Sequence, residues 1–214
     1  IFTKKVIQVN GKKIKKQSDL PNLVSLIWLV PEMDIFFRSN SLLRRKFIDR
    51  CIFNLNPEYL DFLRNYEKNL KERNKILKNI CEKDSFYIEG KNLKEDLWLK
   101  KLEEKLVIEG IKIFQERIKF IDDFNSLSSN FKHFPKIKIF MEGEIEKLFQ
   151  SNSLDIVKKI YLQKLNECRK IDSIKRNISY GPNKSDLKVI FLKKEIFAEK
   201  CSTGEQKIIL ITLI

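Results

Sequence analysis

A short polar stretch near the end of the sequence combines residue types that can hold an anion. Ser202, Thr203 and Gly204 head the segment "STGEQK", which leads directly into an apolar run. If a helix begins here, its first backbone N–H groups lack partners within the helix, and its dipole favours a negative group such as phosphate. A structural interpretation stays open, in which Ser202 only caps the helix and Glu205, three residues later, completes a capping box.

Three further stretches bring charged side chains together. Asp34 follows an apolar run in "WLVPEMDIFF", at the kind of strand end where ligands commonly bind. The segment "RRKFIDR", residues 44–50, holds three arginines and an aspartate within two helical turns, and "YGPNKSDL" is a tight turn that carries Asp186. Taken singly, each stretch has a structural explanation that is simpler than a functional one. The arginines of "RRKFIDR", for example, fit the solvent-exposed face of a helix.

Other kinds of chemistry find no support in the residues. The sequence contains no phosphate loop of the form Gly-x-x-x-x-Gly-Lys-Ser/Thr, and its four cysteines are widely spaced, without a Cys-x-x-Cys pair or a Cys/His group that would hold a metal. His133 is the only histidine, and a loop or packing role is expected for it. The acid pairs Glu103-Glu104 and Asp122-Asp123 are predicted to be solvated charges on helix faces.

The hydrophobic periodicity predicts strands at the start of the chain and helices after them. Two alternating runs around Asn10-Gly11 predict a β-hairpin, and "LVSLIWLVP" fits a strand that is buried on both faces. From about Ser41 the period becomes helical. Two long helical patterns follow, "PEYLDFLRNYEKNLKERNKILKNI" and "LKEDLWLKKLEEKLVIEGIKIFQERIKFIDDF", and these helices are predicted to pack antiparallel.

The pattern then returns to strands before it ends in a helix. "FPKIKIFMEGE" alternates, a third helix is predicted from about Ser153 to Arg169, and "NISYGPNKSDLKVIFLKKEIF" holds turn residues and another strand. The order predicts a mixed α+β or α/β fold, in which a β-containing lobe is built from both ends of the chain. The predicted divisions are a β-lobe over 1–38, a helical lobe over 39–172 and a return to the first lobe over 173–214.

The net charge of +14 has two explanations. Clustered lysines and arginines release counterions from phosphates, so the charge favours a nucleic-acid partner. Alternatively, the charge reflects a composition rich in Lys, Ile and Asn with a single alanine, Ala198, as an AT-rich genome produces. The chain shows no apolar run that approaches a membrane span and no signal-peptide pattern, and the cysteine usage favours a reducing cytoplasm.

The ordered set of motifs resembles the RecF family of bacterial DNA replication and repair proteins. The resemblance runs from about Leu20 to the end, and it is strongest at "RRKFIDR", at the helix "YLDFLRNYEKNL", at the turn "GPNKSDL" and at "CSTGEQK". Several motifs in family order are more specific than any one of them. The resemblance implies an ATPase of the ABC type, related to SMC and Rad-type repair proteins, with a P-loop NTPase head lobe that a helical lobe interrupts.

The resemblance also assigns roles to residues. It places the family's signature motif at Ser202, Thr203, Gly204, Glu205, Gln206 and Lys207. Ser202 would contact the γ-phosphate of ATP held by a second subunit, Gly204 would allow close backbone approach, and Lys207 would add positive charge. Asp34 and Asp186 would lie near this site. Apart from the resemblance, the first candidates for DNA contact are Lys12, Lys13, Lys15 and Lys16 on the early hairpin, followed by Arg44, Arg45 and Arg50. The alternative, that these side chains are only solvated surface, stays open.

The family further implies ATP and Mg²⁺ as cofactors and an ATP-dependent homodimer that clamps single-stranded or gapped DNA. It implies roles in recombinational repair, in replication and in the SOS response to DNA damage, with RecO and RecR as partners.

The sequence departs from the family in two ways. Walker A, whose lysine grips ATP, would precede Ile1, and Walker B, whose acid positions magnesium, would follow Ile214, so the chain is interpreted as a fragment. Alone, it is predicted neither to bind ATP tightly nor to hydrolyse it. Asn183 replaces a histidine common after Gly-Pro. The alternative function is a basic helical module that binds nucleic acid or a protein partner without ATPase activity.

Overall fold

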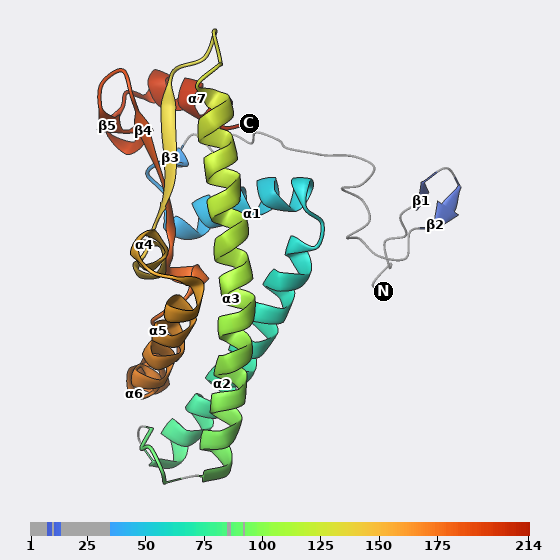
Figure 1. The fold of residues 1–214 in the computed structure, drawn as a ribbon, viewed down its shortest axis with the longest axis vertical. Helices are drawn as coiled ribbons and strands as arrows, with labels where there is room; N and C mark the ends of the chain where they lie inside the picture. Colours follow the sequence, from blue (N-terminus) through green and yellow to red (C-terminus); the bar gives the residue numbers. More distant parts are fainter. Residues whose placement is uncertain (1–7, 10, 14–34, 85–86, 92) are drawn as a thin grey trace.

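The structure is a computed structural model that describes residues 8–9, 11–13, 35–84, 87–91 and 93–214. The main body begins with three helices, α1 (Ser41–Leu55), α2 (Tyr59–Asp84) and α3 (Leu93–Ser128). Figure 1 shows α2 and α3 lying side by side with opposite directions, and α3 extends along most of the long axis of the body. The predicted antiparallel packing of the two long helices is confirmed.

The apolar repeats of these helices face the core as expected. Leu77 and Tyr66 of α2 are buried, and Ile111, Phe114 and Ile121 of α3 are buried in turn. Burial of this apolar stripe is what stabilises such helices, because helix propensity alone is marginal in water. The start of α1 differs slightly from expectation, since Asn40 is the N-cap, accepting a bond from the backbone N–H of Leu43, and Ser41 is the first helical residue.

The C-terminal half alternates short helices with strands. The predicted third helix begins as expected with Ser153 as N-cap but ends two residues early, so that α5 (Leu154–Glu167) is followed by α6 (Arg169–Lys175). An additional helix, α4 (Glu144–Ser151), was not predicted. Its eight residues are too few for a periodic pattern to stand out against the alternating strand that precedes it.

A three-stranded antiparallel sheet lies at one end of α3. Strand β3 (Ile137–Glu142) pairs with β4 (Asp186–Phe191), and β4 pairs with β5 (Ile196–Phe197). The β3–β4 register places Ile139 opposite Val189, and both side chains are buried. This strand pair joins the segments predicted as 39–172 and 173–214, because β3 belongs to the first and β4 to the second. The 3-10 turns η3 (Pro182–Lys184) and η4 (Ala198–Lys200) and the helix α7 (Thr203–Thr212) complete this end.

The early hairpin is confirmed over its described residues. Strand β1 (Gln8–Val9) pairs antiparallel with β2 (Lys12–Lys13), and Gly11 between them has a φ of 75°, which glycine adopts without strain. The predicted strand in "LVSLIWLVP" lies outside the described residues. Within the described ranges, no helix combines the length and apolar character needed to cross a membrane.

A buried ion network joins the helical elements and corrects one prediction. Glu103 is 1% exposed, although it was expected to be solvated, and its carboxylate accepts bonds from Arg73 Nε at 2.9 Å and Arg169 Nη2 at 2.6 Å. Arg73 is fully buried on α2 and also donates to Asp172 of α6 at 2.7 Å. The charges are tolerated in the interior because each has an opposite partner within hydrogen-bond distance.

Replacing Arg73 with methionine should lower the free energy of unfolding by about 3–5 kcal/mol, because it leaves Asp172 buried without its cation. Urea unfolding of the 214-residue chain measures this. Arg64→Met is the matched control on the same helix, since the Arg64–Asp61 pair is exposed with a 3.8 Å separation, and a loss below about 1 kcal/mol is expected there. Equal losses for the two variants would contradict the role given to the network.

Candidate functional site

The segment "STGEQK" forms the capped start of α7. Ser202 is the N-cap, its backbone N–H donates to Glu205 Oε2 at 3.0 Å, and its hydroxyl donates to the same oxygen at 2.9 Å. The backbone N–H of Glu205 donates back to Ser202 Oγ at 3.4 Å. The capping box that the sequence left open as a structural interpretation is therefore present.

The residues of this segment divide into an exposed edge and a buried anchor. Ser202, Thr203 and Gly204 are exposed, and a Cβ built at Gly204 meets nothing within 4 Å. Gln206 is 2% exposed, and its side-chain amide donates to the carbonyl oxygens of Glu199 and Cys201. The bonds of Gln206 hold the segment that precedes α7 in place. The first turn of α7 therefore faces solvent in a defined position.

Lys194 is a charged neighbour of the segment that the sequence did not single out. Its Nζ lies 2.7 Å from Glu205 Oε1, across the turn that follows β4. Hydrogen bonds from Lys194 and from the backbone and hydroxyl of Ser202 lower the pKa of Glu205 to about 2. The carboxylate therefore stays charged at neutral pH, while its charge is balanced by an adjacent ammonium group.

The stretches "RRKFIDR" and "YGPNKSDL" meet in the fold and bind each other. Arg44 is 7% exposed, and its Nε and Nη2 donate to the two carboxylate oxygens of Asp186 at 2.7 and 2.9 Å. Its Nη1 donates to backbone carbonyl oxygens of residues 36, 37 and 39. Burial raises the pKa of Asp186, but Arg44 and Lys188 outweigh it, so this pKa lies below its ordinary value.

A second arginine connects the same two stretches from α3. Arg117, 2% exposed, donates through Nε and Nη2 to the carboxylate of Asp49 at 2.9 and 3.0 Å, and through Nη1 to the carbonyl oxygen of Pro182 at 2.8 Å. Tyr59 donates its hydroxyl to Asp49 at 2.6 Å. Arg45 adds a bond of 2.6 Å to the carbonyl oxygen of Ser185. We call these contacts the motif junction.

The sequence did not identify Arg117 or Tyr59 as members of this junction. The usable signal was that Arg117 lies three residues after Phe114 on the buried stripe of α3, where an arginine needs internal partners. Asn183, in the turn, is half-buried, and its Oδ1 accepts a 3.4 Å bond from the Tyr66 hydroxyl.

The remaining predicted site residues are distributed as follows. Asp34, Lys15 and Lys16 lie outside the described residues, as does the side chain of Lys12, while Lys13 is exposed on β2. Arg50 is half-buried on α1. The bonds of Arg44 occupy its guanidinium within the protein, so the structure gives it an internal partner in place of the expected surface position. Among the described residues, no group of three or more His, Cys, Asp or Glu side chains is placed to hold a metal ion.

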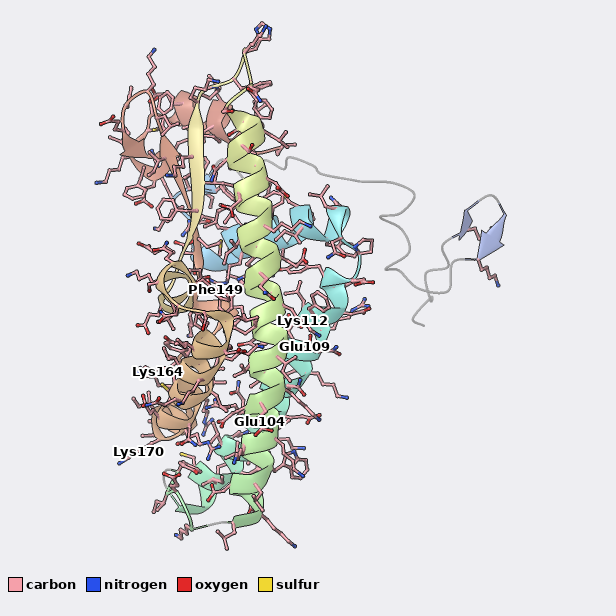
Figure 2. The ribbon with its side chains drawn as sticks, viewed as in Figure 1. Glu104, Glu109, Lys112, Phe149, Lys164 and Lys170 are labelled. Carbon is pink, nitrogen blue, oxygen red and sulfur yellow. The ribbon has the colours of Figure 1, made fainter. Side chains whose placement is uncertain are left out.

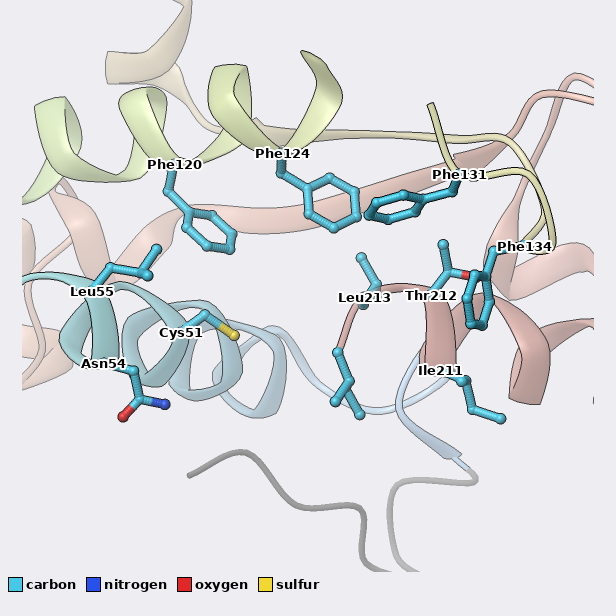
Figure 3. Close-up of a pocket in the computed structure, with 11 residues that line it drawn as sticks. Cys51, Asn54, Leu55, Phe120, Phe124, Phe131, Phe134, Ile211, Thr212 and Leu213 are labelled. Atoms are coloured by element: carbon cyan, nitrogen blue, oxygen red, sulfur yellow. The ribbon is translucent and has the colours of Figure 1, made fainter. Parts of the chain in front are cut away.

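An apolar pocket of about 360 Å³ opens beside the last turn of α7. Figure 3 shows Phe120 and Phe124 of α3 facing Leu213 and Thr212, with Cys51 and Leu55 of α1 closing one side. Several rim residues are large and exposed: Leu55, Phe134, Ile211 and Ile214. An exposed apolar patch of this kind is typical of an interaction surface or a ligand-binding groove.

Known proteins share both the sequence and the fold of this chain. The DNA replication and repair protein RecF of Rickettsia canadensis (strain McKiel) is 33% identical over 212 residues, which cover 99% of this chain and 55% of the relative. RecF of Rickettsia bellii (strain OSU 85-389) is 32% identical over 215 residues, which cover 100% of this chain and 56% of the relative. The chain is homologous to RecF over its whole length. No family model matches it.

Solved RecF structures confirm the fold. The structure of the recombination mediator protein RecF with ATPrS in the RecFOR pathway matches with a TM-score of 0.81 and 25% identity, covering 98% of this chain and 54% of that RecF chain. The corresponding RecF–ATP structure matches with a TM-score of 0.78. The chain spans about half the length of the RecF relatives it matches, and the resemblance drawn from its motifs is confirmed.

The carboxyl group of Glu205 should titrate with a midpoint near pH 2 in the folded chain. Because the folded state lowers this pKa from the ordinary value of 4.5, the capping box contributes its full stability above that value and loses it progressively as the pH falls from there to about 2. Carbon-13 NMR of the side-chain carboxyls measures the midpoint, with Glu205→Gln assigning the signal. Lys194→Met should move the midpoint up toward the ordinary glutamate range, and a midpoint already there in the unmodified chain would contradict the proposed cause.

Proposed function

We propose that this chain supplies the signature half of a RecF-type ATP site that is completed by a second subunit. The observation that carries the proposal is the exposed start of α7, where Ser202, Thr203 and Gly204 face solvent from a fixed, capped position. Homology to RecF supports ATP as the ligand, since solved RecF relatives contain ATP or ATPrS. The same homology supports a general role in DNA replication and repair.

The chemistry of this helix start fits a phosphate approached from outside the chain. Free N–H groups and the helix dipole favour an anion there, and the open space above Gly204 lets a phosphate reach the backbone. Nothing within the described fold requires glycine at this position for space. In this proposal Ser202 turns its hydroxyl from Glu205 to the γ-phosphate of ATP that the partner subunit grips.

A carboxylate so close to a phosphate would ordinarily repel it. At Glu205 this repulsion is reduced because Lys194 Nζ lies 2.7 Å from Oε1 and balances the negative charge locally. Glu205 then serves to hold the Ser202 backbone in place, and Lys194 and Lys207 add positive charge to the surface. The sequence contains no lysine within a phosphate loop, so these residues position ATP and do not hydrolyse it unaided.

The wider proposal follows the RecF family. ATP bridging two subunits would close a dimer on single-stranded or gapped DNA, with RecO and RecR as partners in repair and in the SOS response, in the cytoplasm and with Mg²⁺ accompanying ATP. The net charge of +14 supports contact with phosphates. Figure 2 shows Lys164 and Lys170 on the outer side of α5 and α6, but Lys164 is already paired with Glu167 at 3.0 Å. The early lysines therefore stay the first candidates for DNA contact.

Gly204→Gln should abolish ATP-dependent association with a whole RecF relative without changing the fold. The glutamine side chain extends into space that is empty in this chain, so thermal unfolding should be unaltered while the phosphate is blocked. Sedimentation velocity of the chain mixed with RecF of Rickettsia canadensis, with and without ATP, measures association, and Lys193→Gln at an exposed position is the control. Unimpaired association of Gly204→Gln would contradict the proposal, as would micromolar ATP binding by this chain alone.

Replacing the four early lysines with glutamine should weaken binding to gapped DNA equally for all sequences. The slope of log affinity against log salt should fall by about 0.7–0.9 for each phosphate group that the variant no longer neutralises. Fluorescence anisotropy at several salt concentrations measures this for the variant at Lys12, Lys13, Lys15 and Lys16. The control replaces four exposed lysines of α3, namely Lys100, Lys101, Lys105 and Lys119. A slope that changes only in the control would remove the hairpin from the DNA surface.

A further inference from the structure

The first half of α3 has one side that is buried and one that is exposed. Figure 1 shows α2 lying along this half with α5 beside it, and Leu99, Leu102 and Leu106 are buried there. Figure 1 also shows α7 at the opposite end of the long axis. An inference about the exposed side is therefore independent of the ATP site proposed above.

The exposed side mixes large apolar side chains with lysines. Leu97 is 64% exposed, Trp98 59% and Ile108 52%. Single exposed apolar residues are ordinary, but a group of them on one stretch of helix marks an interaction surface. Six exposed residues form this surface, which we call the outer face of α3: Lys94, Leu97, Trp98, Lys101, Lys105 and Ile108.

The spacing of these residues is that of a helix which packs against another helix. Five of them follow one another in steps of four, three, four and three residues: Lys94, Trp98, Lys101, Lys105 and Ile108. Residues at such steps lie in one stripe along a helix, because the helix turns once in about 3.6 residues. Two helices in contact pack through stripes of this spacing, since the ridges of one fit the grooves of the other.

The charges of the outer face are positive and unbalanced. Among the residues that the structure describes, none of its three lysines takes part in an ion pair. Lys112, one turn beyond the face, is by contrast paired with Glu109 at 3.3 Å and lies over the ring of Phe62. Glu104, labelled in Figure 2, is the one exposed acid over residues 93–108. Acidic side chains on a partner would complement this face.

We propose that the outer face of α3 binds an acidic amphipathic helix of a protein partner. Its acidic side chains pair with Lys94, Lys101 and Lys105, and its apolar side chains cover Trp98 and Ile108. Tryptophan is among the residues that most often dominate the affinity of a protein interface, so Trp98 is expected to contribute the largest single share.

Nucleic acid fits this face less well than a protein helix does. Phosphates also pair with lysines, but protein–DNA interfaces are more polar than protein–protein interfaces. Such an interface gives no apolar partner to Leu97 and Ile108, which are both more than half exposed. A partner helix that carries acidic and apolar residues together satisfies both features of the face.

The test measures the binding of a fluorescein-labelled peptide built from three repeats of the heptad Leu-Glu-Glu-Leu-Ala-Glu-Ala, by fluorescence anisotropy. Saturable binding in the micromolar range is expected, and the same peptide with lysine in place of each glutamate should bind at least about tenfold more weakly. Replacing Lys94, Lys101 and Lys105 together with glutamine should weaken binding of the acidic peptide about tenfold, because three exposed ion pairs are lost.

Two further variants separate docking from attraction by net charge. Lys68, Lys71 and Lys75 are exposed on α2, so their joint replacement with glutamine removes the same charge elsewhere and should change the affinity by less than about twofold. Trp98→Ser leaves the charge unaltered and should weaken binding at least about fivefold. Thermal unfolding of all three variants should match that of the unmodified chain, because the replaced side chains are exposed.

Each other occupant of the face gives a distinct result. Equal losses for the α2 and α3 lysine variants would show attraction by net charge alone and overturn the proposal, as would full affinity in Trp98→Ser or no saturable binding of the acidic peptide. Oligothymidine or phosphatidylglycerol vesicles that displace the peptide at a lower concentration than unlabelled peptide does would assign the face to nucleic acid or to a membrane surface, and would equally overturn it.

Discussion

The arrangement of the helices and the turn before β4 depends on the hydrogen bonds that Arg117 donates to three partners. A guanidinium that is 2% exposed cannot stay unpaired, and here it is satisfied by Asp49 from α1, Tyr59 from α2 and the carbonyl oxygen of Pro182. These partners come from segments up to 68 residues away in sequence. One side chain on α3 therefore fixes the turn before β4 relative to the first two helices, and Arg44 repeats the constraint with Asp186.

Fixing that turn also fixes the surface at the start of α7 that is proposed to contact ATP. Strand β4 begins at Asp186, continues into the turn that carries Lys194, and leads through η4 to the capped start of α7. Displacement of the turn would therefore also displace the start of α7. The stretches "RRKFIDR" and "YGPNKSDL" therefore hold the fold together through internal hydrogen bonds. Among the motifs, the start of α7 is the one that is exposed.

The sequence predicted most of the helices and strands, but it did not predict which side chains contact each other. Alternation and heptad spacing located α2, α3, β3 and β4, because burial of one face leaves a repeating trace in the sequence. The early termination of α5 and the existence of α4 were missed, since ends and short helices depend on local contacts that leave no period. Glu103 was placed in solvent because adjacent acids on a helix usually are solvated; its burial depends on Arg73 and Arg169, which approach it only in the folded chain.

By itself, the sequence determined the family and the chemical types available, because ordered motifs and apolar periodicity are properties of the chain as written. It determined that "STGEQK" can begin a helix, since Ser202 and Glu205 have the spacing of a capping box. Only the tertiary structure decided that Arg44 faces inward and that Lys194 balances Glu205. These outcomes depend on electrostatic pairing and desolvation between distant segments, and such energies are set by proximity in space, which residue order does not record.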